Sequence, residues 1–153
     1  MHPFELKIPP VALAIVIAIA MWGSTLVVHP IELSFVTRII ASSVFVLVGA
    51  GISLAGVLSF KRARTTVNPT NPDAASALVT AGIYRLTRNP MYLGFLFLLL
   101  GWALFLPNGV ALIGPFAFVL YMNRFQITPE ERVLSRLFGT EFAAYQAMVR
   151  RWL

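Results

Sequence analysis

The stretch LVTAGIYRLTRNPMYLG, residues 78–94, is a polar and aromatic segment set between two long apolar runs. Its Arg88-Asn89 pair comes directly before Pro90. Proline is favoured at the first turn of a helix, where its missing N–H costs little, and it keeps the preceding residue extended. The unpaired N–H groups of a helix start attract anions. With Arg85 and Arg88 beside them, this stretch predicts a pocket for an anionic group.

The composition places the chain among integral membrane proteins. Apolar residues make up 58% of the 153 residues, and only 12% are charged. The chain has no cysteine, which excludes disulfides, a thiolate nucleophile and cysteine metal sites. No metal-ligand spacing occurs elsewhere, so we expect no metal. The net charge of +6 beside such apolar runs indicates membrane orientation, and we expect no nucleic-acid partner.

Four apolar runs predict an all-α integral membrane protein with about four transmembrane helices. The predicted spans, within a single domain 1–153, cover residues 9–28, 35–60, 91–106 and 110–123. The first two runs are long enough to cross a bilayer, and we expect the first to be retained as a span rather than cleaved. The last two are short for full spans and flank a Pro-Asn-Gly turn at 107–109.

Positive charges predict the orientation of these spans. If the loop 61–90 is cytoplasmic, then every lysine and arginine except Arg38 lies on the cytoplasmic side. Cytoplasmic loops are enriched in these residues in membrane proteins. Both termini and the pocket are therefore predicted to face the cytosol.

After Arg124 the chain becomes amphipathic. The sequence TPEE at 128–131 predicts an N-cap at Thr128, a proline at N1 and a glutamate at N3 that can close a capping box. Gly139 fits the end of a first short helix, and Thr140 can begin a second. We expect these C-terminal helices, within 128–151, to lie on the cytosolic membrane surface or to close over the pocket.

Three blocks resemble the membrane methyltransferase family of isoprenylcysteine carboxyl methyltransferases and phospholipid N-methyltransferases. They are TTVNP at 65–69, GIYRLTRNPMYLG at 82–94 and EERVLSRLFGTEFAAY at 130–145, in the family's order. Many relatives have Arg-His-Pro where this chain has Arg88-Asn89-Pro90, a variant that resembles short prokaryote-type members. The resemblance implies a location in a prokaryotic plasma membrane.

The resemblance implies an enzyme that binds S-adenosylmethionine, forms S-adenosylhomocysteine and methylates a small lipophilic or membrane-embedded acceptor. The acceptor group would be a carboxylate, amine, thiol or phenol. The implied cofactor-binding residues are Gly49, Gly51, Tyr84, Arg88, Asn89, Pro90, Tyr92, Glu130 and Glu131. Arginine and helix N–H groups suit the cofactor's carboxylate, and glutamates and aromatic rings suit its cations. Tyr92 and Glu131 are the candidates for a general base in catalysis.

The sequence leaves simpler interpretations open. The paired glutamates could serve only as helix caps, and the glycines, together with Gly56, could permit close helix packing. The arginines could be positive-inside anchors, and the tyrosines could be interfacial aromatics. Two other functions also stay open, namely an NADPH-dependent enzyme similar to sterol reductases and a non-catalytic helical scaffold.

Overall fold

A computed structural model describes residues 5–63 and 77–153. In order, the elements are α1 (Pro10–Ser24), α2 (Phe35–Arg62), the 3₁₀ helix η2 (Gly82–Arg85), α3 (Pro90–Phe105), the 3₁₀ helix η3 (Gly109–Leu112), α4 (Ile113–Tyr121), the π-helix η4 (Met122–Ile127) and α5 (Thr128–Met148). No strand occurs in these two ranges, which confirms the all-helical class. The TTVNP block at 65–69 and part of the predicted loop 61–90 lie outside the described residues.

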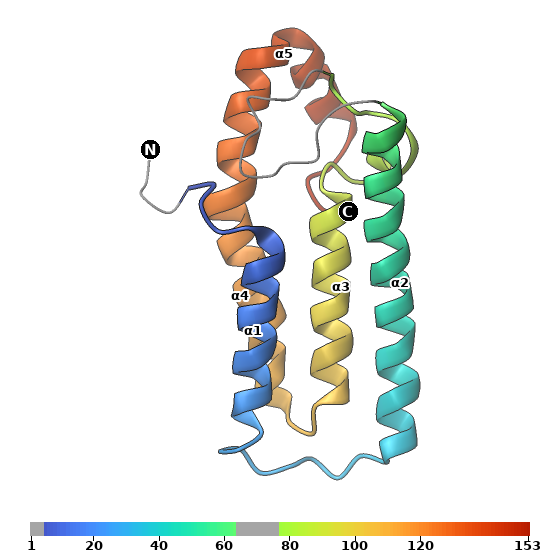
Figure 1. The fold of residues 1–153 in the computed structure, drawn as a ribbon, viewed down its shortest axis with the longest axis vertical. Coiled ribbons are helices and arrows are strands. Elements are labelled where there is room, and N and C mark those ends of the chain that lie inside the picture. Colours follow the sequence, from blue (N-terminus) through green and yellow to red (C-terminus); the bar gives the residue numbers. More distant parts are fainter. Residues whose placement is uncertain (1–4, 64–76) are drawn as a thin grey trace.

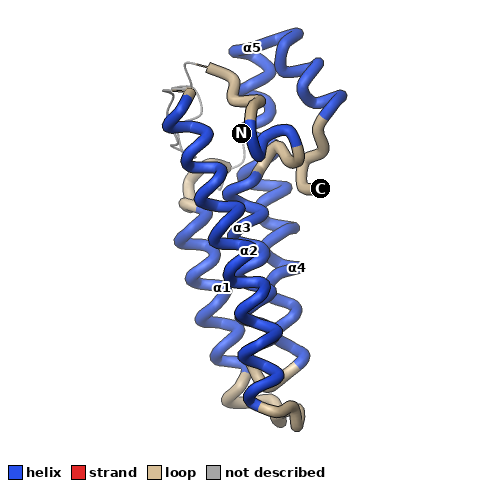
Figure 2. The backbone as a smooth tube through the Cα atoms, turned by 90° about the vertical axis from the view of Figure 1, so that its right-hand side faces the viewer, coloured by secondary structure: helices blue, strands red, loops and turns tan. Residues whose placement is uncertain are grey.

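Helices α1 to α4 run side by side as a bundle, and α5 bends across one end of it (Figures 1 and 2). Helix α3 is the common neighbour, since it packs along α2 and also contacts α1 and α4. Phe118, Met122 and Ile127 are completely buried where α4 continues into α5. The start of α3 lies at the end of the bundle that α5 covers (Figures 1 and 2), and Arg88, Asn89 and Pro90, which were predicted to bind a ligand, lie at that start.

Large apolar side chains cover the outside of the bundle. Exposed examples are Ile15 and Ile19 on α1, Val44 and Leu47 on α2, and Phe116 on α4. A contiguous apolar exterior is unfavourable in water and suits the hydrocarbon core of a bilayer. Two helical stretches, α2 and the run Gly109–Met148, are long and apolar enough to cross a membrane, whereas α1 and α3 are shorter. These features are consistent with a membrane protein.

The first predicted span, 9–28, is a shorter helix than expected, because α1 ends at Ser24. The Ser24 hydroxyl donates to the carbonyl of Met21, and the Thr25 hydroxyl donates to the carbonyl of Trp22. Hydroxyl groups that bond to nearby carbonyls compete with the helical pattern. Turns replace the helix after Ser24, up to Val28.

Glycines set the close crossing of α2 and α3. A Cβ atom on Gly49 would lie 2.7 Å from the carbonyl oxygen of Gly94, and a Cβ on Gly94 would lie 2.7 Å from that of Gly49. A Cβ on Gly56 would meet Met91 and Pro90, at 2.9 and 3.3 Å. Small residues permit such close approach between membrane helices. The packing interpretation is therefore supported for Gly49 and Gly56.

The predicted N-cap at Thr128 is wrong, because the chain continues without a break from α4 through η4 into α5, although α5 does begin at Thr128. Thr128 has helical angles, and its hydroxyl donates to the Asn123 carbonyl at 2.7 Å instead of capping. Pro129 explains the wide π turn, since a proline ring clashes with the carbonyl four residues earlier in a regular α-helix. That carbonyl, of Phe125, accepts the N–H of Leu6 at 3.1 Å.

Gly139 interrupts α5 as predicted, with φ 47° and ψ −118°. Glycine tolerates this positive φ because it has no Cβ. Beyond it, Phe142 and Tyr145 pack on Val79 and Tyr84 in a second apolar cluster. The second half of α5 therefore covers the 78–84 segment, as one of the two sequence expectations proposed.

Candidate functional site

The 82–87 segment that leads into α3 is held by aromatic contacts. Tyr84 in η2 is buried, and its ring meets Phe60 edge-on with centroids 5.4 Å apart. The Tyr145 hydroxyl of α5 donates to the Tyr84 carbonyl at 2.7 Å. Burial raises the pKa of Tyr84, and negative charge on Tyr145 and Glu130 raises it further. Tyr84 is therefore a neutral, buried packing residue at physiological pH.

Arg88 links this segment to α5. Its Nη2 donates to Glu131 Oε1 at 2.8 Å, and both side chains are largely buried, at 13% and 15% exposure. Its Nη1 donates to the carbonyls of Gln146 and Val149, at 3.1 and 2.9 Å. Its Nε–H is buried and has no hydrogen-bond partner among the described residues. Arg88 is thus tied to α5 and still has one buried donor for a ligand.

Tyr92 and Glu130 form a second contact between α3 and α5. The buried Tyr92 hydroxyl donates to Glu130 Oε1 at 2.5 Å, and the Gln126 amide donates to the same oxygen at 2.5 Å. Glu130 lies past Arg124, beyond the apolar part of the Gly109–Met148 run. Burial raises the pKa of Glu130 to about 7, although the hydrogen bonds from Tyr92 and Gln126 oppose the rise. This carboxyl therefore changes its charge near neutral pH.

Neighbouring residues on a helix point about 100° apart, which separates the two glutamates. Glu130 meets Tyr92, whereas Glu131 meets Arg88 and also Arg151, whose Nε lies 3.1 Å from Glu131 Oε1. No side-chain cap is formed at the start of α5, so the predicted capping box is absent. The carboxylates of Glu130 and Glu131 instead bond different residues. We call Arg88, Tyr92, Glu130 and Glu131 the site cluster.

Asn89 and Pro90 join the cluster to the start of α3. Pro90 is fully buried at the first helical position, as predicted. Asn89 has φ −130° and ψ 56°, and its side chain makes no cap. Its Nδ2 donates to the carbonyl of Arg151 at 2.9 Å, and its backbone N–H donates to Thr87 Oγ1 at 3.2 Å.

Gly49 and Gly51 have no residue of the site cluster among their nearest neighbours. The nearest atoms to a Cβ on Gly49 belong to Gly94, Phe97 and Leu98 of α3, and a Cβ on Gly51 would meet nothing within 4 Å. Their predicted role against the cofactor stays a prediction.

Gln126 and Arg151 are two site residues that the sequence interpretation missed. Gln126 stands four residues before Glu130, the spacing at which helical side chains meet, so its position could have been found. Arg151 gave no such signal, since a basic residue near a chain end is typical of a positive-inside anchor.

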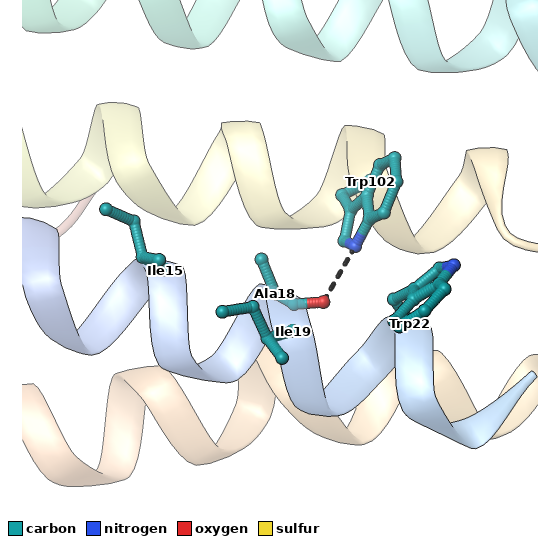
Figure 3. Close-up of a pocket in the computed structure, with 5 residues that line it drawn as sticks. All are labelled: Ile15, Ala18, Ile19, Trp22 and Trp102. Atoms are coloured by element: carbon teal, nitrogen blue, oxygen red, sulfur yellow. Dashed lines mark hydrogen bonds between the residues drawn. The ribbon is translucent and has the colours of Figure 1, made fainter.

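A separate apolar groove lies between α1 and α3, lined by Ile15, Ala18, Ile19, Trp22 and Trp102 (Figure 3). Trp102 Nε1–H points at α1 and donates to the Ala18 carbonyl at 3.0 Å. Trp102 stands twelve residues after Pro90 on α3, a rise of about 18 Å along the helix. The groove is therefore distant from the site cluster, and its lining suits hydrocarbon rather than a charged ligand.

Comparisons with known proteins show a family match over more than half of the chain. Residues 36–141 match a protein-family model described as phospholipid methyltransferase. This range contains all of α2 except Phe35, the start of α3 and both glutamates of the site cluster. No solved structure gives a significant match.

Curated relatives include plant and bacterial proteins. The chain is 34% identical to protein-S-isoprenylcysteine O-methyltransferase A of Arabidopsis thaliana over 109 residues, which are 69% of this chain and 54% of that protein. It is 34% identical to a probable protein-S-isoprenylcysteine O-methyltransferase of Oryza sativa subsp. indica, over 72% of this chain and 58% of that protein. A Haemophilus influenzae protein described as uncharacterized is 48% identical over 63 residues, which are 41% of this chain and all of that protein. The chain thus spans a little over half the length of the plant relatives.

Proposed function

Because the chain belongs to the phospholipid methyltransferase family, we propose that it is a membrane enzyme that uses S-adenosylmethionine to methylate a lipophilic acceptor. The acceptor would be small or membrane-embedded, with a carboxylate, amine, thiol or phenol as the methylated group. The names of the plant relatives, protein-S-isoprenylcysteine O-methyltransferases, support methyl transfer as the type of reaction.

The observation that carries the proposal is the meeting of two segments that are far apart in the sequence. Arg88 Nη2 lies 2.8 Å from Glu131 Oε1, and the Tyr92 hydroxyl oxygen lies 2.5 Å from Glu130 Oε1. A site with both a guanidinium and carboxylates suits a ligand that carries both charges. The cofactor has a carboxylate, an ammonium and a sulfonium, so its charges match those of the site cluster.

The unpartnered Nε–H of Arg88 adds to this fit. A buried donor without a partner costs free energy, and a ligand acceptor would remove that cost. In the proposed complex, Arg88 Nε–H would donate to the cofactor's carboxylate. Glu131 would face the ammonium, and the aromatic ring of Tyr92 would face the sulfonium region.

When bound, S-adenosylmethionine supplies a methyl group already activated on a sulfonium, so that attack by the acceptor leaves S-adenosylhomocysteine. The protein's tasks are then to align the acceptor, exclude water and accept a proton where the acceptor carries one. Glu130 suits the proton-accepting task, because its carboxyl titrates near neutral pH and touches the Tyr92 hydroxyl. Glu131, engaged by two guanidiniums, suits binding better than proton transfer.

The proposal also covers the membrane arrangement. We place four spans across a prokaryotic plasma membrane, with both termini and the site cluster on the cytoplasmic side. The charged cofactor would then enter from the cytosol, and the acceptor would enter from the bilayer between the helices. Apolar side chains on the outside of α1, α2 and α4 support a location in a membrane, and the distribution of lysine and arginine along the sequence supports the orientation.

Isothermal titration of S-adenosylmethionine into the detergent-solubilised protein tests the proposal. We expect binding by the unaltered protein and at least roughly 30-fold weaker binding by Glu131→Gln. This variant removes the carboxylate that is proposed to pair with the ammonium of the cofactor, and removing one partner of a buried ion pair costs about 2 kcal/mol or more of binding free energy. Glu141→Gln is the matched control, because Glu141 is an exposed glutamate of the same helix. Absence of binding by the unaltered protein, or binding of NADPH in its place, would reject the proposal.

The methyl acceptor can be identified by incubating the protein with membrane lipid extracts and methyl-labelled S-adenosylmethionine. We expect label in an organic-soluble product, and much less label with Glu131→Gln at the same cofactor concentration. Label confined to water-soluble products would contradict a lipophilic acceptor.

A further inference from the structure

Residues 149–152 turn back from the end of α5 to the start of α3 (Figures 1 and 2). Val149 is extended, with φ −124° and ψ 132°, and this ends the helix. The carbonyl of Arg150 then accepts the backbone N–H of Arg88 at 3.0 Å, and the carbonyl of Arg151 accepts Asn89 Nδ2 at 2.9 Å. The final segment is therefore held by the same residues that were predicted to bind the cofactor.

Two more bonds fix this segment on either side. The Thr87 hydroxyl donates to the Arg151 carbonyl at 3.2 Å, and Trp152 Nε1–H donates to Asn123 Oδ1 in η4 at 3.0 Å. The segment therefore bridges the start of α3 and the junction of α4 and α5. Its backbone position is set independently of the Arg151 side chain.

The Arg151 side chain bonds the same carboxylate as Arg88, that of Glu131, and it contacts both carboxylate oxygens. Arg151 Nη2 bonds Glu131 Oε2 and Arg151 Nε bonds Oε1, while Arg88 Nη2 bonds Oε1. A guanidinium that contacts both carboxylate oxygens fixes the plane of the carboxylate as well as its position. An ammonium group is a point charge and cannot fix that plane.

We propose that Arg151 is a positioning residue of the cofactor site, which orients the Glu131 carboxylate toward the ammonium of an amino-acid moiety. This inference rests on the proposed function. It differs from the membrane-anchor interpretation of Arg151 in a measurable way. An anchor acts through charge alone, so neighbouring Arg150 would serve equally well and lysine would replace either residue. Positioning requires the planar group at residue 151.

The test measures the dissociation constant of S-adenosylmethionine by isothermal titration in detergent for four proteins: unaltered, Arg151→Gln, Arg151→Lys and Arg150→Gln. We expect Arg151→Gln to bind roughly tenfold more weakly and Arg151→Lys to recover only part of that loss. Arg150→Gln removes the same charge from an exposed side chain and should stay within about twofold of the unaltered protein. A thermal scan of each variant verifies folding, and Arg151→Lys carries the test if Arg151→Gln does not fold.

A double variant separates positioning from direct contact. If Arg151 acts through Glu131, then Glu131→Gln with Arg151→Gln binds no more weakly than Glu131→Gln alone. Multiplied losses in the double variant, equal losses in Arg150→Gln, or unchanged binding by Arg151→Gln would overturn the inference while leaving the proposed function in place. Absence of binding by the unaltered protein would overturn both.

Discussion

The two ends of the helix bundle use their polar side chains differently. At the end where α3 finishes, Arg38 and Asn108 bond the main chain. Arg38 Nε donates to the Phe105 carbonyl at 2.7 Å, and Asn108 Oδ1 accepts the N–H of Ala111 at 3.0 Å. These bonds close the exposed ends of two helices, a purely structural task. They also explain the position of Arg38, the one basic residue predicted to lie away from the cytosol.

At the end where α3 begins, charged side chains bond one another across the chain. Arg88 pairs with Glu131, and Tyr92 bonds Glu130, over sequence separations of 43 and 38 residues. Charged side chains that bond one another can exchange these partners for the charged groups of a ligand, whereas Arg38 and Asn108 bond neutral main-chain groups. The difference teaches that, within residues 5–63 and 77–153, the end where α3 begins has the paired charges that suit a charged ligand.

The strongest challenge to this comparison is the removal of one arginine from each end. We expect Arg88→Met to abolish measurable S-adenosylmethionine binding and to destabilise the protein by about 3 kcal/mol, because Glu131 keeps one guanidinium fewer in a largely buried place. Arg38→Met should cost about 1 kcal/mol through the lost bond to Phe105, with unchanged binding. Titration and unfolding in detergent measure the two effects. Equal losses of binding would show that the two ends do not differ.

Helices α2 and α3 run between the two ends of the bundle. The importance of their close packing is tested by adding one methyl group, through glycine-to-alanine substitutions. Gly94→Ala would place a Cβ 2.7 Å from the Gly49 carbonyl oxygen, and we expect a stability loss of about 2 kcal/mol. Gly51→Ala meets open space and should be neutral for stability, within about 0.5 kcal/mol. If Gly51→Ala weakens cofactor binding, the sequence-based role of this glycine gains support; unfolding in detergent and titration give both answers.

The ionisation of Glu130, at the end of the bundle where α3 begins, predicts that the folding stability depends on pH. The folded state holds a proton on Glu130 up to about pH 7, whereas the unfolded chain loses it near the ordinary value of 4.5. The contribution of protonated Glu130 to folding stability is therefore fully present below about pH 4.5 and is lost as the pH rises to about 7. The melting temperature of the unaltered protein should fall relative to Glu130→Gln across this window, and parallel curves would contradict the assignment.

If the ionised form of Glu130 serves the cationic cofactor, then binding should strengthen as the pH rises through about 7. We expect roughly tenfold between pH 6 and pH 8, a change that corresponds to about 1.4 kcal/mol. Glu130→Gln should bind with little pH dependence over the same range. Titrations at three pH values measure this difference.

A small effect is expected at the end of the bundle where α3 finishes. Asn108→Ala removes the acceptor for the Ala111 N–H and should cost about 1 kcal/mol of stability, with unchanged cofactor binding. Thermal unfolding in detergent compares it with the unaltered protein. A loss of binding in this variant would mean that the distant helix end influences the site cluster.

Local features of the site were predictable from single stretches of sequence. Pro90 begins α3 and Gly139 interrupts α5, because their backbone preferences act within one helical turn. The Thr128 prediction failed for an equally physical reason. Pro129 can follow a π turn as well as an N-cap, and the choice depends on contacts such as Leu6 N–H to Phe125, which are distant in the sequence.

By itself, the sequence determined an all-helical chain with an apolar exterior and a polar segment before α3, since composition and short-range periodicity carry that information. Only the tertiary structure decided that Glu130 takes Tyr92 while Glu131 takes Arg88 and Arg151. The reason is that these pairs lie between 20 and 43 residues apart, where no local rule fixes the partner. Packing of α5 over the start of α3 brings each pair within hydrogen-bond reach.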